Sequence, residues 1–230
     1  MSRAALLVLL SGLLGCQTNK PPEKPIVVEV YADLVCPWCF IGTERLEKVL
    51  AESPNGARVQ VKHRAFQLDP STPPEGTDVA AMLEQRYGRP ARELFAPAEA
   101  QARSSGLALD LSKQPRSYNT AAAHALLAKA EAKGTQRELK RALFRAHFVE
   151  AKNVSDVAVL TELATKHGFS ADEVAQAVRD TSAVAVANDE ARARGVTGVP
   201  YFVFCGGKAV SGAQPESVLR DAIAECARGD

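Results

Sequence analysis

The stretch IVVEVYADLVCPWCFIG, residues 26–42, places two cysteines, Cys36 and Cys39, where one local pattern gives way to another. Residues 26–35 are rich in β-branched and apolar side chains on both faces, which predicts a buried central strand. Beyond Cys36 the apolar residues recur at helical spacing, and Pro37 suits the first turn of a helix, where its missing N–H is no loss. The pattern predicts a strand that leads directly into a helix, with Cys36 at the helix N-terminus.

Two further segments extend this unit into an α/β fold. Residues 57–68, ARVQVKHRAFQL, predict a second strand, so the N-terminal part is expected to form a parallel βαβ unit. Residues 199–214, VPYFVFCGGKAVSGAQ, predict two antiparallel strands joined by a turn at Gly206 and Gly207. Because a helix is expected over residues 215–229, the two ends of the chain supply a βαβ half and a ββα half.

The middle of the chain has a different character. It is rich in alanine and charged residues and is helical in period almost throughout, with no repeat of fixed length. We therefore expect an all-helical insertion over residues 76–180, between an N-terminal half at residues 26–75 and a C-terminal half at residues 181–230. The chain has 230 residues, of which 46% are apolar, enough for a sizeable core.

The charge balance and the cysteine count exclude some classes of function. The net charge is +1 and no long basic run occurs, so binding of nucleic acid is not expected. Five cysteines are too few for a scaffold built from disulfides, and their odd number indicates that at least one has a separate role.

The spacing of Cys36 and Cys39 suits thiol–disulfide exchange. A helix N-terminus presents unpaired N–H groups and about half a positive charge, and both favour a thiolate at Cys36. Cys39 lies about one turn further on, so we expect Cys36 to be the exposed attacking sulfur and Cys39 the buried resolving one. Pro37 stiffens the loop. Trp38 cannot hydrogen-bond a thiolate through a ring nitrogen as a histidine can, which predicts a less oxidising pair than one with histidine in its place.

Other roles for these residues stay open from the sequence. Half of a zinc site would need a second ligand pair, and no other CxxC or close Cys/His pair occurs. A purely structural disulfide is an alternative, although a bridge across so short a loop adds little stability through loop entropy. The four histidines are expected at the surface or in a satisfied core, and His124 is the best candidate among them to line a cleft. They are His63, His124, His147 and His167.

Five segments carry a resemblance to a known family, namely CPWCFIG (36–42), FQLDP (66–70), NTAAAHALL (119–127), GVTGVPYFVF (195–204) and VSGAQP (210–215). On these segments the chain resembles the thioredoxin superfamily and, within it, the DsbA-like thiol–disulfide oxidoreductases, most closely the FrnE-like branch. The resemblance implies a thioredoxin fold with inserted helices and disulfide exchange with cysteines of other proteins. Neither a cofactor nor a metal is expected, because no metal or nucleotide motif appears in the sequence. It also implies that Pro200 follows Val199 through a cis peptide bond, which proline makes accessible, and faces the CxxC motif.

Two other functions remain as alternatives. Kappa-class glutathione transferases and hydroxychromene-carboxylate isomerases are similar to this chain, but they typically carry serine where it has Cys36. A glutathione-dependent transferase or isomerase is therefore the first alternative, with glutathione as a candidate partner, although the presence of both Cys36 and Cys39 favours redox chemistry. The second alternative is a non-enzymatic chaperone or binding module that uses the helical insertion.

Cys205 and Cys226 are expected to meet at the far end of the fold. The strand after Pro200 runs away from the active-site end toward Cys205, and the final helix runs in the same direction toward Cys226. About five strand residues and about eleven helical residues both span about 17 Å, so the two cysteines should lie side by side. We predict a structural disulfide between them. Two buried free thiols are the alternative.

The N-terminus, MSRAALLVLLSGLLGC, has one basic residue, Arg3, followed by a short apolar run over residues 4–14. A run this short is typical of a signal-peptide core and not of a membrane span. Its end resembles the bacterial lipoprotein signal, which implies a signal peptide over residues 1–15, a lipid on Cys16 and a polar tether over residues 16–25. An ordinary secretory signal with a chance cysteine is the alternative.

Export would set the surroundings of the mature chain. Gln17, in place of aspartate, favours the outer membrane, so we expect a periplasm-facing lipoprotein of a bacterial cell envelope, held to the membrane by its lipid alone. That compartment is oxidising, so disulfide exchange can occur there. The expected partners are cysteine-containing exported proteins and a redox partner, not identified by the sequence, that recycles Cys36 and Cys39.

Overall fold

The computed structural model describes residues 24–229, and its N-terminal part is a βαβ unit. Strand β1 (Ile26–Ala32) leads into helix α1 (Pro37–Glu52), and a 3-10 turn, η1 (Gly56–Arg58), leads into strand β2 (Val59–Ala65). β1 and β2 pair in parallel along their whole length. The last three residues of β1 are all buried, because the strand is covered on both faces.

The C-terminal part completes the sheet. It consists of β5 (Tyr201–Phe204), β6 (Lys208–Ser211) and helix α9 (Glu216–Arg228). β5 pairs antiparallel with β1, and β6 pairs antiparallel with β5, which gives the strand order β2-β1-β5-β6. The α/β class and the thioredoxin fold predicted from the sequence are confirmed, and β1 is the central strand that leads to the CxxC motif.

Between these two parts the chain forms mainly helices. They are α2 (Val79–Tyr87), α3 (Ala91–Ser104), α4 (Ala121–Lys133), α5 (Gln136–Phe148), α6 (Val157–Thr165), α7 (Ala171–Arg179) and α8 (Ser182–Ala193). A 3-10 turn, η2 (Leu111–Lys113), and two short strands accompany them. These strands, β3 (Thr77–Asp78) and β4 (Arg116–Ser117), pair antiparallel. They were not predicted, because a strand of only two residues leaves no recognisable pattern in the sequence.

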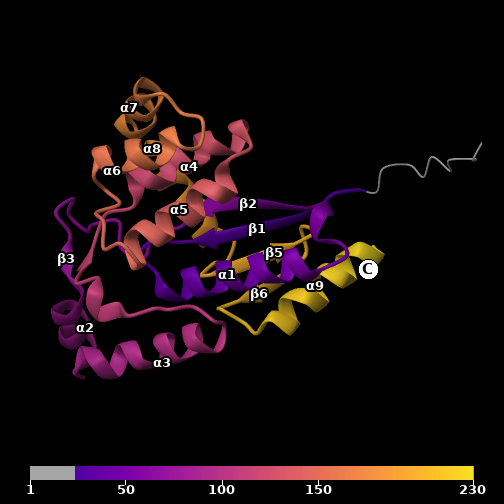
Figure 1. Cartoon of the computed structure of the whole chain (residues 1–230), viewed down its shortest axis with the longest axis horizontal. Coiled ribbons are helices and arrows are strands. Elements are labelled where there is room, and N and C mark those ends of the chain that lie inside the picture. The colour runs from indigo at the N-terminus through magenta and orange to yellow at the C-terminus, as the bar shows by residue number, and fades with distance from the viewer. Residues whose placement is uncertain (1–23, 230) are drawn as a thin grey trace, which may run out of the picture.

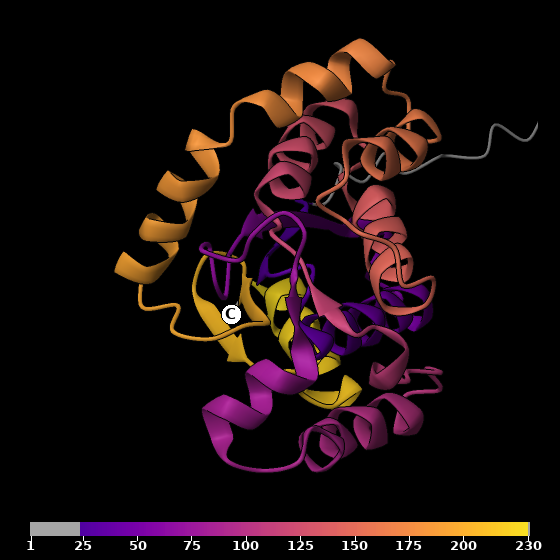
Figure 2. The same cartoon turned by 90° about the vertical axis from the view of Figure 1, so that its left-hand side faces the viewer.

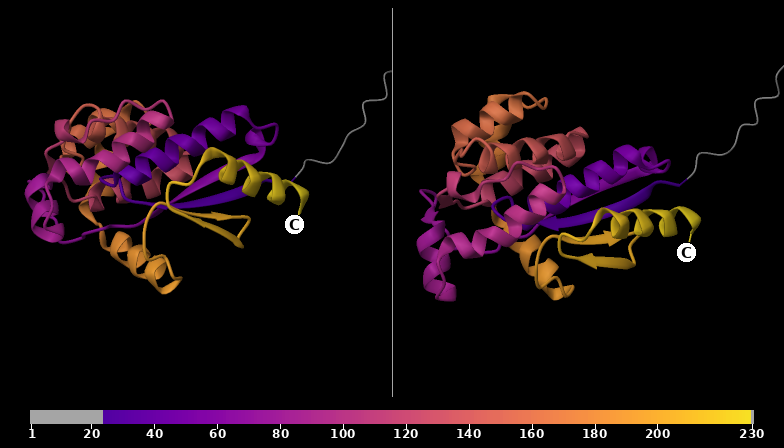
Figure 3. Two further views of the ribbon diagram at one scale, coloured as in Figure 1. Left: turned by 90° about the horizontal axis from the view of Figure 1, so that it is seen from below. Right: turned by 60° about the horizontal axis from the view of Figure 1, so that its bottom comes forward.

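The helices cover the sheet unequally. α1 and α9 lie together on one face, and α8 lies on the other side of the sheet (Figure 3). The helices of the insertion gather at the end where β1 stops and α1 begins (Figure 1). Seen from that end, they lie around the sheet, with α2 and α3 at the bottom of the view (Figure 2). The insertion therefore surrounds the end of the sheet at which Cys36 lies.

One hydrophobic core joins the insertion to the sheet. Phe40 of α1 stacks on Phe148 of α5 with ring centroids 5.4 Å apart, and its centroid lies 5.6 Å from that of Phe144. All three side chains are buried in a cluster that also includes residues of β1, α4 and α9. Because the core is shared, α5 is held close to the helix that carries the two cysteines.

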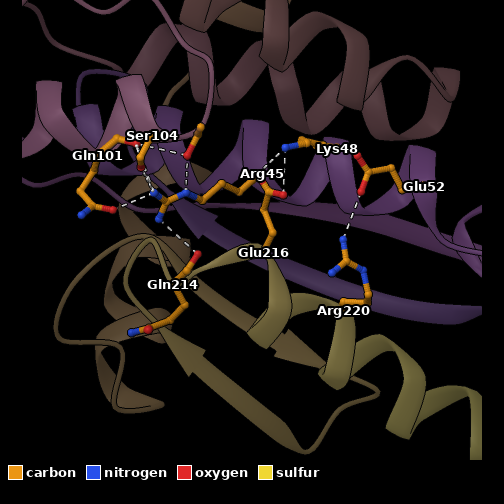
Figure 4. A network of polar contacts seen from close by, with 9 residues as sticks. Arg45, Lys48, Glu52, Gln101, Ser104, Gln214, Glu216 and Arg220 are labelled. Carbon is orange, nitrogen blue, oxygen red and sulfur yellow. Dashed lines mark hydrogen bonds and ion pairs between the residues drawn. The ribbon is translucent and has the colours of Figure 1, made fainter.

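Arg45, in α1, ties three parts of the chain together (Figure 4). Its buried guanidinium donates one hydrogen bond to the side chain of Gln101 in α3, at 2.8 Å, and another to the carbonyl of Ala213 after β6, at 2.6 Å. On the same side of α1, Lys48 pairs with Glu216 of α9 at 3.1 Å. These contacts fix α1 to the insertion and to the C-terminal part at once.

The predicted signal peptide, Cys16 and most of the predicted tether lie outside the described residues, and those assignments stay predictions. Within residues 24–229, no helix has both the length and the apolar composition needed to cross a bilayer.

Candidate active site

Cys36 caps the N-terminus of α1. Its Sγ accepts a hydrogen bond from the backbone N–H of Cys39 at 3.4 Å, and Pro37 occupies the first helical turn. The N–H of Cys36 donates to the carbonyl of Asp33, 3.2 Å away, which fixes the turn between β1 and the helix. A sulfur in this position receives both a hydrogen bond and the positive end of the helix dipole, and both favour its thiolate.

The loop before β5 faces Cys36. The Val199–Pro200 peptide bond is cis, and the Cys36 thiol donates to the Val199 carbonyl over 3.8 Å. Gly42 shows how closely this loop approaches α1, because a Cβ atom there would lie only 2.9 Å from Cγ of Pro200. A larger residue would push the loop and the helix apart. Val199 and Pro200 therefore lie where the family resemblance placed them.

The two sulfurs differ less in exposure than the sequence suggested. Cys36 is only 4% exposed and Cys39 is fully buried, so the expectation of an exposed Cys36 was wrong. The loop at Val199 and the first turn of α1 cover Cys36, which nevertheless lines a cleft, whereas Cys39 does not. Both are free thiols. Burial, reinforced by the hydrogen bond and the charge of Cys36, raises the pKa of Cys39 well above its ordinary value.

A cleft of about 680 Å³ opens beside Cys36, between the start of α1, helices α2 and α3, and the cis-proline loop. Three large apolar side chains line it although they are exposed to solvent, namely Trp38, Leu68 and Tyr87. Arg86 also lines the cleft and adds positive charge. A mostly apolar cleft with a few polar groups is typical of a binding site for a ligand or a chain segment.

A group of buried polar residues joins α5 to α1 and to β2. Lys140 of α5 is 1% exposed, and its Nζ lies 2.5 Å from Nδ1 of His63 on β2. Glu47 of α1 accepts two hydrogen bonds from Nε of Arg137, both at 2.8 Å. Burial lowers the pKa of Lys140 to about 7, while the charges of Cys39 and Glu47 act in the opposite direction. Within residues 24–229, no three His, Cys, Asp or Glu side chains converge on a metal site.

The structure gives His124 and His147 different surroundings, which the sequence analysis did not distinguish. His124, the best candidate for the cleft, is buried instead with its Nε2 3.7 Å from Oδ1 of Asp33, and it lines a second cavity. His147 lines the cleft, and its Nδ1 lies 3.2 Å from Nε2 of Gln114. Burial lowers the pKa of His147 to about 4, so this side chain is neutral at neutral pH.

Cys205 and Cys226 lie at the other end of the sheet. They are joined by a disulfide that closes a loop with a sequence separation of 21, which is the pairing expected from the lengths of the last strand and helix. The N–H of Cys205 donates to the carbonyl of Val27 at 2.9 Å, next to the start of β1. Because Cys36 follows the end of β1, the length of that strand separates the two cysteine pairs.

Sequence reasoning missed three contributors to the site, namely Asp33, Gly42 and Lys140. Gly42 belongs to the CPWCFIG motif, but its role depends on a contact with a loop about 160 positions away, which no local pattern reveals. Lys140 did carry a signal. It lies one turn before Phe144, within the apolar stripe of α5, where a charged residue is out of place.

Together these features define a class of protein, in which a CxxC pair at a helix N-terminus faces a cis-proline in a thioredoxin fold. The family model for the DsbA-like thioredoxin domain matches residues 27–224, and the chain belongs to this family. It is similar to the structure of the probable DsbA oxidoreductase SCO1869 from Streptomyces coelicolor, with 36% identity and a TM-score of 0.78 over 89% of this chain and 91% of that one.

Two further proteins match most of this chain. The uncharacterized protein YwbO of Bacillus subtilis (strain 168) is 27% identical over 209 residues, which are 86% of this chain and 96% of that protein. The structure of a 2-hydroxychromene-2-carboxylate isomerase has a TM-score of 0.65 over 88% of this chain and 97% of its own. With 17% identity, this second likeness extends to the fold alone.

Proposed function

We propose that this protein is a thiol–disulfide oxidoreductase that exchanges disulfides with the cysteines of exported proteins through Cys36 and Cys39. The observation that carries the proposal is the position of the Cys36 sulfur, at the N-terminus of α1 and 3.8 Å from the carbonyl of Val199. A thiolate is favoured there, and the backbone before Pro200 lies beside the sulfur that would enter a mixed disulfide.

The exchange proceeds in two displacements. In the oxidising direction, a substrate thiolate attacks Sγ of Cys36 in the Cys36–Cys39 disulfide, a mixed disulfide forms, and Cys39 leaves as a thiolate that takes up a proton. A second substrate thiolate then attacks the substrate sulfur of the mixed disulfide, and Cys36 leaves as a thiolate. Two electrons have moved from the substrate to the pair, and a separate redox partner must remove them. The same steps in reverse reduce a substrate disulfide.

The lining of the cleft supports a protein substrate. Among the described residues, three of the six large apolar side chains that are exposed to solvent lie in this cleft, namely Trp38, Leu68 and Tyr87. Such a concentration of exposed apolar surface around one sulfur suits an unfolded segment, whose own apolar side chains are available.

A glutathione-dependent isomerase or transferase is the second candidate. The positively charged Arg86 and Arg192 in the cleft favour it, since they could pair with the carboxylates of a small anionic thiol. The variant Cys39→Ser separates the two functions. An isomerase that uses only one sulfur keeps its turnover in this variant, whereas an oxidoreductase loses its resolving thiol.

The proposed function is tested by incubating the oxidised protein with a reduced two-cysteine peptide and following peptide disulfide formation by mass spectrometry. Turnover is expected in the wild type and not in Cys36→Ser. Undiminished prevention of substrate aggregation by Cys36→Ser, with no exchange in the wild type, would instead support a non-enzymatic chaperone.

The direction of exchange follows from the reduction potential of the pair. Trp38 is the only tryptophan and lies between the two sulfurs, so its fluorescence can follow a glutathione titration. A potential above about −160 mV would assign a donor of disulfides, and one below about −220 mV a reductase. Intermediate values would direct the next assay to disulfide isomerisation.

We further propose that the chain is anchored by a lipid on Cys16 and faces the periplasm. The lipoprotein-like sequence at residues 1–16 supports this location. Expression in a bacterium fed with radiolabelled palmitate tests it, because the wild type should carry the label in the outer-membrane fraction. The variant Cys16→Ser should carry no label, and a labelled variant would refute the assignment.

A further inference from the structure

Arg192, in the last turn of α8, is held at the wall of the cleft beside Cys36. Its Nη2 donates a hydrogen bond to the carbonyl of Gln67 at 3.2 Å, and its Cζ lies 4.8 Å from the ring centroid of Phe66. The N–H of Gln67 in turn donates to Oδ1 of Asn188 at 2.8 Å, one turn earlier in α8. The guanidinium therefore has a fixed place at the rim of the cleft, although the residue is exposed to solvent.

The segment that holds Arg192 is joined to the turn before Cys36. Oδ2 of Asp33 accepts the N–H of Leu68 at 2.7 Å, and the carbonyl of the same Asp33 accepts the N–H of Cys36 at 3.2 Å. Leu68, Cys36 and Arg192 all line the cleft. A short series of contacts therefore connects the guanidinium with the backbone of the attacking cysteine, so a chain segment in the cleft can meet both side chains.

The guanidinium of Arg192 has donors left for a ligand. A guanidinium presents several N–H donors in a planar fork. Within residues 24–229, the carbonyl of Gln67 is the only hydrogen-bond acceptor that Arg192 binds, and no carboxylate pairs with it. A carboxylate can accept two parallel hydrogen bonds from such a fork, so the side chains of aspartate and glutamate fit it in both shape and charge.

The charges in the cleft also favour an anionic ligand. Arg86, in the last turn of α2, is exposed and adds a second cation to the lining. The lining contains one carboxylate, that of Asp69, whose Oδ1 already accepts the N–H and the hydroxyl of Ser71 at 2.9 and 2.6 Å. His147, whose pKa burial lowers to about 4, is neutral at neutral pH. With two cations and one carboxylate, the lining of the oxidised protein has a net charge of +1.

This charge affects which chain segments the cleft can hold. A purely apolar segment could pack on Trp38, Leu68 and Tyr87, but it would cover guanidinium donors without replacing the water that they bind. A lysine or arginine of the segment would be repelled. An aspartate or glutamate would instead supply the missing acceptor, while the apolar side chains beside it stay in contact with the cleft.

We propose that Arg192, assisted by Arg86, determines substrate specificity by binding the carboxylate of an aspartate or glutamate close to the substrate cysteine. The proposal rests on the proposed function, since it names the class of protein segments with which Cys36 would exchange. Arg192 acts on binding alone. The bonds that form and break at Cys36 are the same whatever the charge of the substrate.

Three peptides that each contain one cysteine test the proposal. They are identical except for the residues two positions before and two positions after the cysteine, which are both Glu, both Gln or both Lys. Excess peptide is mixed with the oxidised protein, and the fluorescence of Trp38 follows the reduction of the Cys36–Cys39 disulfide. A first peptide thiolate forms the mixed disulfide with Cys36 and a second displaces Cys36 from it, so that two peptide thiols become one peptide disulfide.

A charge beside a thiol also alters the reactivity of the thiol itself. Each rate is therefore divided by the rate of the same peptide with 2-hydroxyethyl disulfide, which is an uncharged oxidant. On this scale, the Glu peptide should react about tenfold faster than the Lys peptide at low ionic strength, with the Gln peptide between them. The preference should shrink in about 0.5 M salt, which screens exposed charges.

Charge reversal at the rim of the cleft gives the sharpest comparison. Arg192→Glu should reverse the preference, so that the Lys peptide becomes the faster one, and Arg192→Gln should reduce it to about twofold, the part that Arg86 supplies. Arg194→Glu is the matched control. It reverses the charge of an exposed arginine two residues further on, whose Nη1 lies 3.5 Å from the hydroxyl of Tyr31 and which is not among the described residues that line the cleft. This control should keep the preference of the wild type.

Equal normalised rates of the three peptides with the wild type would overturn the proposal. So would an unchanged preference in a folded Arg192→Glu variant, or an equally large change in Arg194→Glu, which would indicate a general field and not a binding contact. Should Arg192→Glu not fold, the comparison of the three peptides with the wild type decides. If the wild type exchanges with none of the peptides, the proposed function fails, which is a distinct result.

A small anionic thiol is the other source of the same carboxylate chemistry. S-methylglutathione, which has two carboxylates but no free thiol, distinguishes it from a protein segment. If the three peptides react equally and S-methylglutathione slows all of them, the two arginines serve a small thiol and the proposal is overturned. If the Glu peptide is preferred, the carboxylate that they bind belongs to the protein segment.

Discussion

The two cysteine pairs lie at opposite ends of the central strand and differ in an unexpected way. Cys36 and Cys39 are three residues apart, buried and free, whereas Cys205 and Cys226 are separated by 21 residues and bridged. Of the bridged pair, Cys205 is exposed to solvent and Cys226 is half-buried. The pair assigned to redox chemistry is therefore the less accessible one.

The difference shows that exposure alone does not decide the role of a thiol. What distinguishes Cys36 and Cys39 is their surroundings, which comprise a helix N-terminus and a carbonyl before a cis-proline. Each of these can favour a thiolate or receive a substrate sulfur. A bridge across a loop of about 20 residues instead restricts the unfolded chain, and so contributes stability. The following predictions test whether the two ends of the sheet really divide reactivity and stability between them.

The largest expected effect is on activity at the end that holds Cys36. Cys36→Ser should lower the rate of disulfide exchange by at least about 1,000-fold, because a hydroxyl cannot form the mixed disulfide. The double variant Cys205→Ala, Cys226→Ala should keep the rate within about twofold of the wild type. Rates are measured with the two-cysteine peptide. A comparable loss of activity in the double variant would show that disulfide exchange also depends on the Cys205–Cys226 disulfide.

For stability, the larger effect is expected at the other end of the sheet, at Cys205 and Cys226. The double variant Cys205→Ala, Cys226→Ala should lose about 3 kcal/mol in its free energy of unfolding, the usual effect of a loop of this length. Urea titration of the oxidised proteins measures it, with Cys36→Ala, Cys39→Ala as the matched double variant. That control should change much less, since the loop between its two cysteines is short. Equal losses in both variants would show that stability is not concentrated at the far end.

A smaller effect is expected at Gly42. A methyl group there would approach Cγ of Pro200 to 2.9 Å and the ring of Phe202 to 3.2 Å. Gly42→Ala should therefore shift the loop away from Cys36 and slow exchange about tenfold. Gly207→Ala, in the turn between β5 and β6, is the control because nothing lies within 4 Å of the added atom. An unchanged rate in Gly42→Ala would mean that the contact with Pro200 does not set the geometry of the site.

The smallest effect concerns the residue between the two sulfurs. Trp38→His should raise the reduction potential by about 30 mV or more, because an imidazole can stabilise the Cys36 thiolate and so the reduced form. The variant lacks the only tryptophan, so its redox state is read by alkylation of the thiols during a glutathione titration. A potential equal to or below that of the wild type would show that Trp38 does not tune the pair.

The sequence predicted those parts of the molecule whose determinants are local. The β-branched run of residues 26–35 led to the central strand, the helical spacing after Cys36 led to α1, and the short C-terminal strands followed from their turn at Gly206 and Gly207. The disulfide between Cys205 and Cys226 could also be placed, because a strand and a helix of known rise leave from the same end of the sheet.

The parts that escaped prediction depend on contacts between distant segments. The burial of Cys36 results from a loop more than 160 residues further on, and His124 is turned away from the cleft by its position against Asp33. Likewise, a lysine in a helix normally lies on the solvated face, but Lys140 is buried because α5 packs against β2 and, through Phe144, against Phe40 of α1. Periodicity indicates which face of a helix is apolar but not which element it will meet.

The hydrogen bonds of Arg45 bear on whether the inserted helices could be removed from the thioredoxin fold. Its guanidinium is bound on one side by the insertion, through Gln101, and on the other by the carbonyl of Ala213 in the ββα half. Deleting the insertion would remove the Gln101 partner of this guanidinium and would uncover Phe40, which packs against Phe144 and Phe148 of α5. The inserted helices therefore cannot be regarded as a detachable module.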